Sequence, residues 1–218
     1  MSTEPLPFLK QTLPALFNKG FSILKQKAEA GDTRWKASYD DIAPVVGGAV
    51  VSVEGQGTVY LTVENGNMTA GDAKPSAPIK IAVEFPSDAM EVVLGEAARE
   101  GHFEDERVAI AAAHLASKQL ETALMGKPMT CHILVKDAPD LGDVTVKLGF
   151  NVEEPPVKPG FTAQLKYDDL EDVREGKLNL QQLFMQGKLR MQGDYSLALQ
   201  IAMQMAAKAQ QQLAAAKK

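Results

Sequence analysis

Few residues of this chain have side chains typical of nucleophilic catalysis or of metal binding. It contains three histidines, at positions 102, 114 and 132, and one cysteine, Cys131. No two histidines are four residues apart, the spacing that places two imidazoles on one face of a helix as metal ligands. Cys131 and His132 are neighbours in a predicted strand and point to opposite faces, which excludes a simple Cys–His catalytic pair. We therefore expect a structural role for each, and no metal site.

Two further patterns have an ordinary structural explanation. Gly55 and Gly57 precede a predicted strand, not a helix, so they belong to a turn rather than to a dinucleotide-binding loop. Four acidic residues gather between positions 168 and 172. They could be cation ligands or an acid–base pair, but a predicted helix begins there, and its unpaired N–H groups favour acidic side chains. The sequence thus predicts no catalytic residue and no cofactor.

Composition excludes several classes of protein. The chain has 218 residues, of which 45% are hydrophobic and 23% charged, as in ordinary globular proteins. A net charge of −5 argues against nucleic-acid binding, which needs a positive surface for the phosphates. A single cysteine excludes an intrachain disulfide and fits a reducing compartment. Early prolines interrupt any signal sequence, and no apolar run approaches the roughly 20 residues that span a bilayer, so we expect a cytoplasmic protein.

The elements that must position any site alternate between helices and strands. In the N-terminal part we predict a helix over residues 13–30, strands over 49–54, 58–64 and 78–85, and a helix over 87–94. The apolar face of the first helix is expected to be buried, with transient contact to a membrane surface left open. In the C-terminal part we predict helices over 106–125, 168–174 and 180–185, strands over 129–136, 144–150, 161–167 and 189–191, and a last helix from Asp194.

The last helix is apolar on more than one side. Leu197 and Ile201 form one row and Leu199 and Met203 another, whereas a single sheet normally covers only one side of a helix. Methionine is also flexible enough to line a space whose contents vary. From the residues alone, a ligand pocket explains these two apolar rows as well as a plain core or a dimer contact does.

One long stretch is similar to a known family. Its residues are Gln182, Phe184, the run Gln186-Gly187-Lys188-Leu189-Arg190-Met191, then Gly193-Asp194 and the apolar residues 197–199. This stretch resembles the end of the sterol carrier protein 2 family, the non-specific lipid-transfer domains. The resemblance extends from near residue 104 to the C-terminus. It implies an α+β fold, with a sheet rich in antiparallel pairs covered by helices.

The resemblance also implies a function. Such a domain binds and carries a hydrophobic ligand, such as a fatty acid, a fatty acyl-CoA or a sterol, in an apolar tunnel without catalysis. The alternative function is that of a non-catalytic module that binds another protein through the same apolar helix surface. Whether the chain forms a homodimer is left open. Gln186 and Lys188 are candidates for meeting a polar head group, with a solvated turn as the alternative. The wall residues that the resemblance implies are Leu170, Val173, Leu180, Phe184, Leu189, Met191, Leu197, Leu199, Ile201 and Met203.

Two segments of the chain look alike. Residues 79–96 and 161–177 each contain an alternating strand, an acidic cap, an apolar helical turn and a glycine. We interpret the chain as two units, residues 1–100 and 104–218, of which the first is either a degenerate copy of the second or similar to it by chance. The first unit has no counterpart of residues 186–189. We therefore expect it to supply an extra wall or lid rather than a second lipid site.

Overall fold

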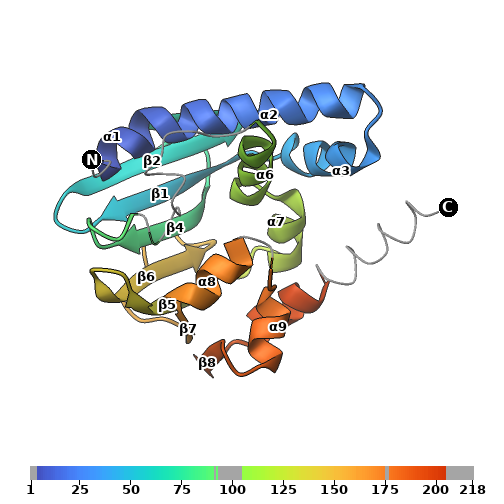
Figure 1. Ribbon diagram of the computed structural model, residues 1–218. Coiled ribbons are helices and arrows are strands. Elements are labelled where there is room, and N and C mark those ends of the chain that lie inside the picture. The colour runs from blue at the N-terminus through green and yellow to red at the C-terminus, as the bar shows by residue number, and fades with distance from the viewer. Residues whose placement is uncertain (1–3, 91, 93–104, 175–176, 205–218) are drawn as a thin grey trace.

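An eight-stranded mixed sheet runs through the molecule, with helices packed against it (Figure 1). This computed structural model describes residues 4–90, 92, 105–174 and 177–204. Within these residues the strands lie in the order β3-β2-β1-β4-β6-β5-β7-β8. The fold is α+β, as predicted. The strands are β1 (Gly47–Val53), β2 (Gly57–Glu64), β3 (Asn67–Gly71), β4 (Ile79–Phe85), β5 (Met129–Ala138), β6 (Gly142–Phe150), β7 (Phe161–Lys166) and β8 (Arg190–Gly193).

The sheet is continuous between the two predicted units. β4 of the first pairs antiparallel with β6 of the second, from Ile81 opposite Phe150 to Glu84 opposite Lys147. Both halves repeat one pairing pattern: β1 is antiparallel to β2 and parallel to β4, and β5 is antiparallel to β6 and parallel to β7. The division into two units and the duplication remain predictions. The two halves share this strand topology, as a duplication would produce.

Most of the predicted helices are present among the described residues. Of the helix predicted over 87–94, positions 91, 93 and 94 lie outside the described residues, whereas 87 and 88 form a turn and 90 and 92 are helical. After β8, residues 196–204 are helical, as expected for the last helix. The others are α1 (Pro5–Pro7), the π-helical segment η1 (Phe8–Thr12), α2 (Leu13–Glu29), α3 (Thr33–Ile42), α6 (Asp105–Leu115), α7 (Lys118–Leu124), α8 (Tyr167–Arg174) and α9 (Leu180–Met185).

Helix α2 buries its apolar face in the main core. Leu13, Phe17 and Leu24 are all less than a tenth exposed. Gly20 lies where α2 meets α6, and a Cβ atom there would come within 2.5 Å of the carbonyl oxygen of Val108. The missing side chain therefore lets two helices approach closely, which fixes α6 over the sheet (Figure 1).

Three local predictions need correction. The single helix predicted over residues 106–125 is two helices, because Ser117 begins a new one: its Oγ accepts a hydrogen bond from the N–H of Leu120 at 3.1 Å. The segment between the helix predicted over 13–30 and the strand predicted over 49–54 reads as a polar connection, but residues 33–42 form helix α3 and Trp35 is buried. Strand β3, which follows a turn at Asn65 and Gly66 and pairs antiparallel with β2, was not among the predicted strands.

Helix length also bears on membranes. In the part of the chain that the structure describes, every helix is too short or too polar to pass through a lipid bilayer.

Candidate functional site

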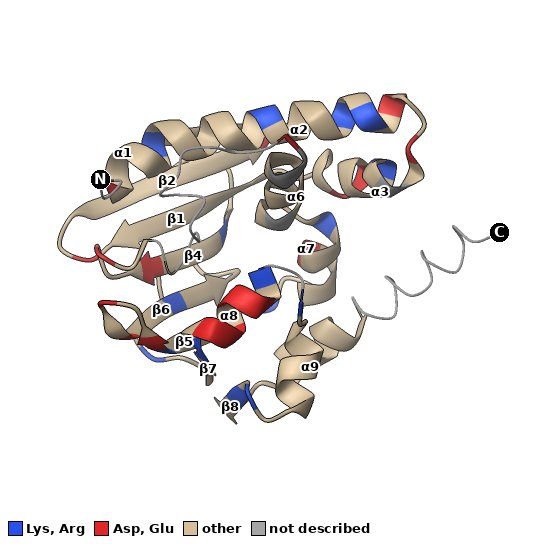
Figure 2. Cartoon of the chain, in the orientation of Figure 1, with Lys and Arg blue, Asp and Glu red and all other residues tan. Residues whose placement is uncertain are grey.

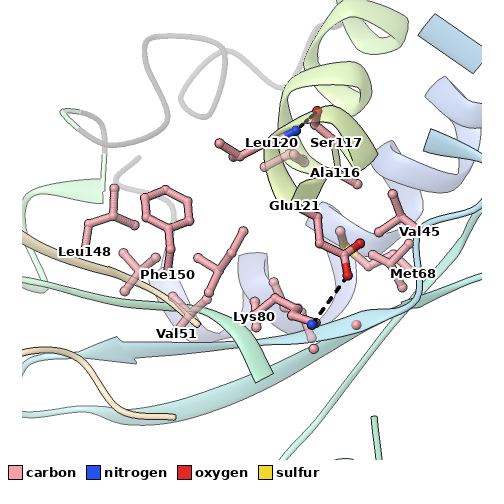
Figure 3. A pocket seen from close by; sticks show the side chains of 18 of the residues that line it. Val45, Val51, Met68, Lys80, Ala116, Ser117, Leu120, Glu121, Leu148 and Phe150 are labelled. Carbon is pink, nitrogen blue, oxygen red and sulfur yellow. Dashed lines mark hydrogen bonds and ion pairs between the residues drawn. The ribbon is translucent and has the colours of Figure 1, made fainter. Parts of the chain in front are cut away.

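An apolar pocket of about 350 Å³ lies between the sheet and the helices (Figure 3). Strands β1, β2, β4 and β6 form one side, and η1, the start of α2 and helix α7 contribute the other. Most of its wall is aliphatic or aromatic. Representative wall residues are Leu9, Leu13, Val51, Leu61, Val83, Leu120, Leu124, Leu148 and Phe150.

Small residues help to explain why this space is not filled by the protein itself. Gly47, Gly48 and Ala49 follow one another at the start of β1, and Ala116 lies between α6 and α7. All four line the pocket. A core is normally packed to the density of an organic crystal, so a group of small residues in its wall leaves a hollow unless larger neighbours move in.

The pocket reaches the surface at one side. Val46 and Leu115 line it and are 46% and 38% exposed. Two charged residues are among those that line the described wall, Lys80 and Glu121, and their side chains are 35% and 28% exposed. Figure 3 shows the Lys80 side chain directed toward Glu121. This rim therefore offers both an apolar entrance and a polar group.

Glu121 is held by two lysines. Its Oε1 lies 3.4 Å from Lys80 Nζ, and its Oε2 accepts a hydrogen bond from Lys118 Nζ at 2.7 Å. The hydrogen bond from Lys118 holds the pKa of Glu121 below its ordinary value of 4.5. The carboxylate is therefore ionised at neutral pH, and the cluster carries a net charge of about +1.

The residues predicted as tunnel walls lie elsewhere. None of the ten lines this pocket, and their location in a ligand site stays a prediction. In the described structure Ile201 is buried. Leu170, Val173, Leu189, Met191 and Leu197 are partly buried, and Leu180, Phe184, Leu199 and Met203 are between 38% and 66% exposed.

The two head-group candidates have protein partners. Lys188 Nζ donates to Oδ1 of Asp169 at 2.7 Å, and this hydrogen bond raises the pKa of Lys188. Asp169 is only 8% exposed and belongs to the acidic first turn of α8 (Figure 2). Gln186 ends α9, and its backbone N–H donates to the carbonyl of Gln182. Lys188 therefore neutralises a buried carboxylate in this structure.

The predicted region nevertheless adjoins the pocket. Leu148 lines the pocket and also packs against a second apolar cluster built on Cys131 and Ala163. Leu189 and Met191, both predicted wall residues, pack against this same cluster. The two regions thus meet at strand β6.

The candidates for chemistry have structural surroundings. Burial raises the pKa of the Cys131 thiol to about 11, which leaves it protonated and unreactive near neutral pH. His132 Nε2 lies 2.9 Å from the carbonyl oxygen of Pro156. His102 and the side chain of His114 lie outside what the structure describes. Among the described residues, no three His, Cys, Asp or Glu side chains are grouped so that they could hold a metal ion.

Comparison with known proteins assigns the chain to a family. A family model described as the SCP-2 sterol transfer family matches residues 96–206, half of the chain. The chain belongs to this family. The match includes α6, α7 and all strands from β5 to β8, and it confirms the resemblance found in the sequence. No curated protein matches the sequence.

Solved structures with some similarity include sterol carrier proteins. A sterol carrier protein 2 from Yarrowia lipolytica (apo form) is 22% identical over 37% of this chain and 67% of that protein, with a TM-score of 0.27. The sterol carrier protein domain 2 of Helicoverpa armigera is 25% identical over 46% of this chain and 76% of that protein, with a TM-score of 0.28. The sec-alkylsulfatase Pisa1 from Pseudomonas sp. is 22% identical over 38% of this chain and 13% of that enzyme, with a TM-score of 0.25. The assignment to the SCP-2 sterol transfer family rests on the sequence match.

Sequence reasoning missed the pocket because its strongest motif lies in the other half of the chain. Of the described residues that line the pocket, fifteen precede residue 96, where the family match begins, and nine follow it. One sequence feature could have found it. Gly47 and Gly48 precede an apolar strand, and paired glycines at a strand start are typical of a bulge or of a site where something approaches the backbone closely.

Proposed function

We propose that this chain binds a hydrophobic lipid in the apolar pocket and carries it, releasing it unchanged. The observation that supports the proposal most is an apolar hollow in a member of the SCP-2 sterol transfer family. Water gains few hydrogen bonds in such a space, whereas a lipid chain exchanges water for apolar contacts. No bond needs to break, so the proposed role is that of a carrier and not of an enzyme.

The size of the pocket favours a single chain. Its volume of about 350 Å³ is near the lower end of the roughly 300–1,000 Å³ typical of ligand sites. Burying about ten methylenes at about 0.8 kcal/mol each contributes roughly 8 kcal/mol before the cost of immobilising the ligand. This contribution alone corresponds to a dissociation constant of about 1 μM, and the cost of immobilisation makes the affinity weaker than that. Among the ligands named above, a fatty acid or the acyl chain of a larger molecule fits this volume best.

Two measurements test the proposal. Protein purified without detergent is examined by native mass spectrometry and by extraction into organic solvent, and we expect a bound lipid. Delipidated protein is then titrated with a fluorescent fatty acid and competed with unlabelled lipids. Absence of any bound lipid together with absence of any displacement would contradict the proposal, and an obligate oligomer under the same conditions would favour the protein-binding alternative.

A matched pair of variants locates the site. Leu120→Trp enlarges a side chain on the α7 wall of the pocket, and Leu199→Trp makes the same change at a predicted wall residue that is 42% exposed. We expect Leu120→Trp to weaken lipid binding at least tenfold and Leu199→Trp to leave it unchanged. The reverse pattern would indicate that the lipid binds beside the C-terminal helix and not in this pocket.

Transfer is measured separately from binding. Donor vesicles containing a self-quenched fluorescent fatty acid are mixed with acceptor vesicles, with and without the protein. A carrier increases the rate of dequenching in proportion to its concentration. Binding without any such increase would mean that the protein stores lipid and does not transfer it.

A further inference from the structure

Strand β4 contains an irregularity at Lys80. Gly48 of β1 pairs with Ile79, but the next residue, Ala49, pairs with Ile81. Lys80 therefore has no partner residue on β1. An extra residue of this kind is a β-bulge, which bends the strand locally and changes the direction of a side chain.

The packing on either side of the bulge shows the change in direction. Ile79 and Ala82 belong to one small apolar cluster, whereas Val83 and Phe85 pack in the main core on the other side of the sheet. In an uninterrupted strand, residues three apart point to opposite faces. Because Ile79 and Ala82 share a face, the alternation is broken between them, and Lys80 is brought to the pocket wall.

The sequence opposite the bulge leaves room for the lysine. A Cβ atom on Gly47 would lie 2.9 Å from Cγ of Lys80, closer than ordinary contact distance. The glycine thus allows the aliphatic part of Lys80 to lie across β1 while its ammonium group reaches Glu121 (Figure 3).

The arrangement of charges leaves Lys80 available to an anion. Glu121 accepts a short hydrogen bond from Lys118, at 2.7 Å, and has a longer contact with Lys80, at 3.4 Å. An anionic head group can therefore pair with Lys80 while Glu121 remains paired with Lys118. No charge is left without a partner after this exchange, which avoids the penalty of an unpaired, partly buried ion.

We infer that Lys80 is the head-group anchor of this pocket and determines its specificity, so that the pocket selects single-chain lipids with an anionic head group over neutral lipids of the same length. The inference rests on the proposed function. Glu121 is the counter-ion of Lys80 when the pocket is empty. A neutral sterol, which offers a hydroxyl group and no charge, is a poorer ligand by the same reasoning. A hydrogen bond to a charged group contributes enough to give roughly a tenfold preference.

The experiment compares lipids that differ only in the head group. Delipidated full-length protein is titrated by calorimetry with dodecanoic acid, dodecyl phosphate and dodecan-1-ol at pH 7.5. Lys80→Met keeps the aliphatic part of the side chain and removes the charge, and Lys80→Arg keeps the charge. Lys74→Met is the matched control, because Lys74 pairs with Glu153 and does not line the pocket. Thermal unfolding of each variant confirms that it is folded.

The expected results are specific to the charge. The wild type and Lys74→Met bind the two anionic lipids about tenfold more tightly than the alcohol, and the ranking of carboxylate against phosphate identifies the better head group. Lys80→Met loses this preference with its affinity for the alcohol unchanged, whereas Lys80→Arg retains it. Glu121→Gln binds the anions more tightly and the alcohol as before. Equal binding of acid and alcohol by the wild type would overturn the inference but not the proposed function, and binding of none of the three would contradict the function itself.

Discussion

A pair of alanine-to-phenylalanine substitutions tests whether the pocket is a true hollow. Ala49 lies on β1 and lines the pocket, and Ala163 lies on β7 in the cluster beside Leu189 and Met191, where it is 9% exposed. Both residues are in strands, where phenylalanine is favourable. The two variants therefore make the same chemical change in an empty space and in a packed one.

The expected effects have opposite signs. A phenyl ring at position 49 enters a space of about 350 Å³, and full burial of a phenylalanine side chain contributes about 1.5–3 kcal/mol. Allowing for incomplete burial, Ala49→Phe should stabilise the ligand-free protein by about 1 kcal/mol. Ala163→Phe has no such space and should destabilise the protein by about 1–3 kcal/mol through overpacking. Each kcal/mol corresponds to a shift in Tm of roughly 2–4 °C for a chain of this size.

Urea unfolding of delipidated protein, followed by circular dichroism, measures the two free energies of unfolding. The same preparations are titrated with a fluorescent fatty acid. The ring at position 49 occupies the room of about five methylenes, which at about 0.8 kcal/mol each limits the loss of affinity to roughly a thousandfold. If Ala49→Phe destabilises the protein as much as Ala163→Phe does, the pocket is already filled and the reasoning is refuted.

Four further predictions concern stability and reactivity. Because burial raises the pKa of Cys131 to about 11, a disulfide reagent at pH 8 should label this thiol only after the protein is unfolded; labelling at the rate of free cysteine would contradict its burial. Gly20→Ala should destabilise the protein by roughly 1–3 kcal/mol through a clash with α6, whereas Gly71→Ala, which meets nothing within 4 Å, should be tolerated. Leu183→Ala, at a fully buried position of α9, should cost about 2–5 kcal/mol in urea unfolding. The pKa of Glu121 is lower in the folded protein than its ordinary 4.5. Its ionisation therefore stabilises the fold above pH 4.5 and ceases to do so as pH falls through the lowered pKa. The difference in free energy of unfolding between wild type and Glu121→Gln should be present at about pH 7 and disappear in acid.

Much of the fold could be predicted from the sequence because local signals were strong there. Helix α9 spans Leu180–Met185, as predicted, and Asn179 and Gln182 form a reciprocal capping box at its start. The strands on either side of the Gly55–Gly57 turn were predicted from alternation, and they pair as a hairpin. In both places the residues that fix the structure are neighbours in the chain.

The errors arose where distant residues decide the structure. Trp35 is in a helix of low average hydrophobicity, and tertiary packing buries it although the surrounding pattern is that of a polar connection. The Lys80 bulge depends on how β4 pairs with β1, some thirty residues earlier. The pocket itself is formed by residues that local patterns mark as ordinary core, and only their three-dimensional arrangement leaves a hollow between them.

The pairing of β4 with β6 makes the part of the chain that matches the family depend on the part that does not. If residues 96–206 were expressed alone, β6 would lose its neighbour and become an open edge, with a row of unpaired backbone N–H and C=O groups from Lys147 to Phe150. Such edges recruit strands from other molecules. That fragment should therefore aggregate or form strand-exchanged dimers, and the pocket would lose the wall supplied by β1, β2 and β4.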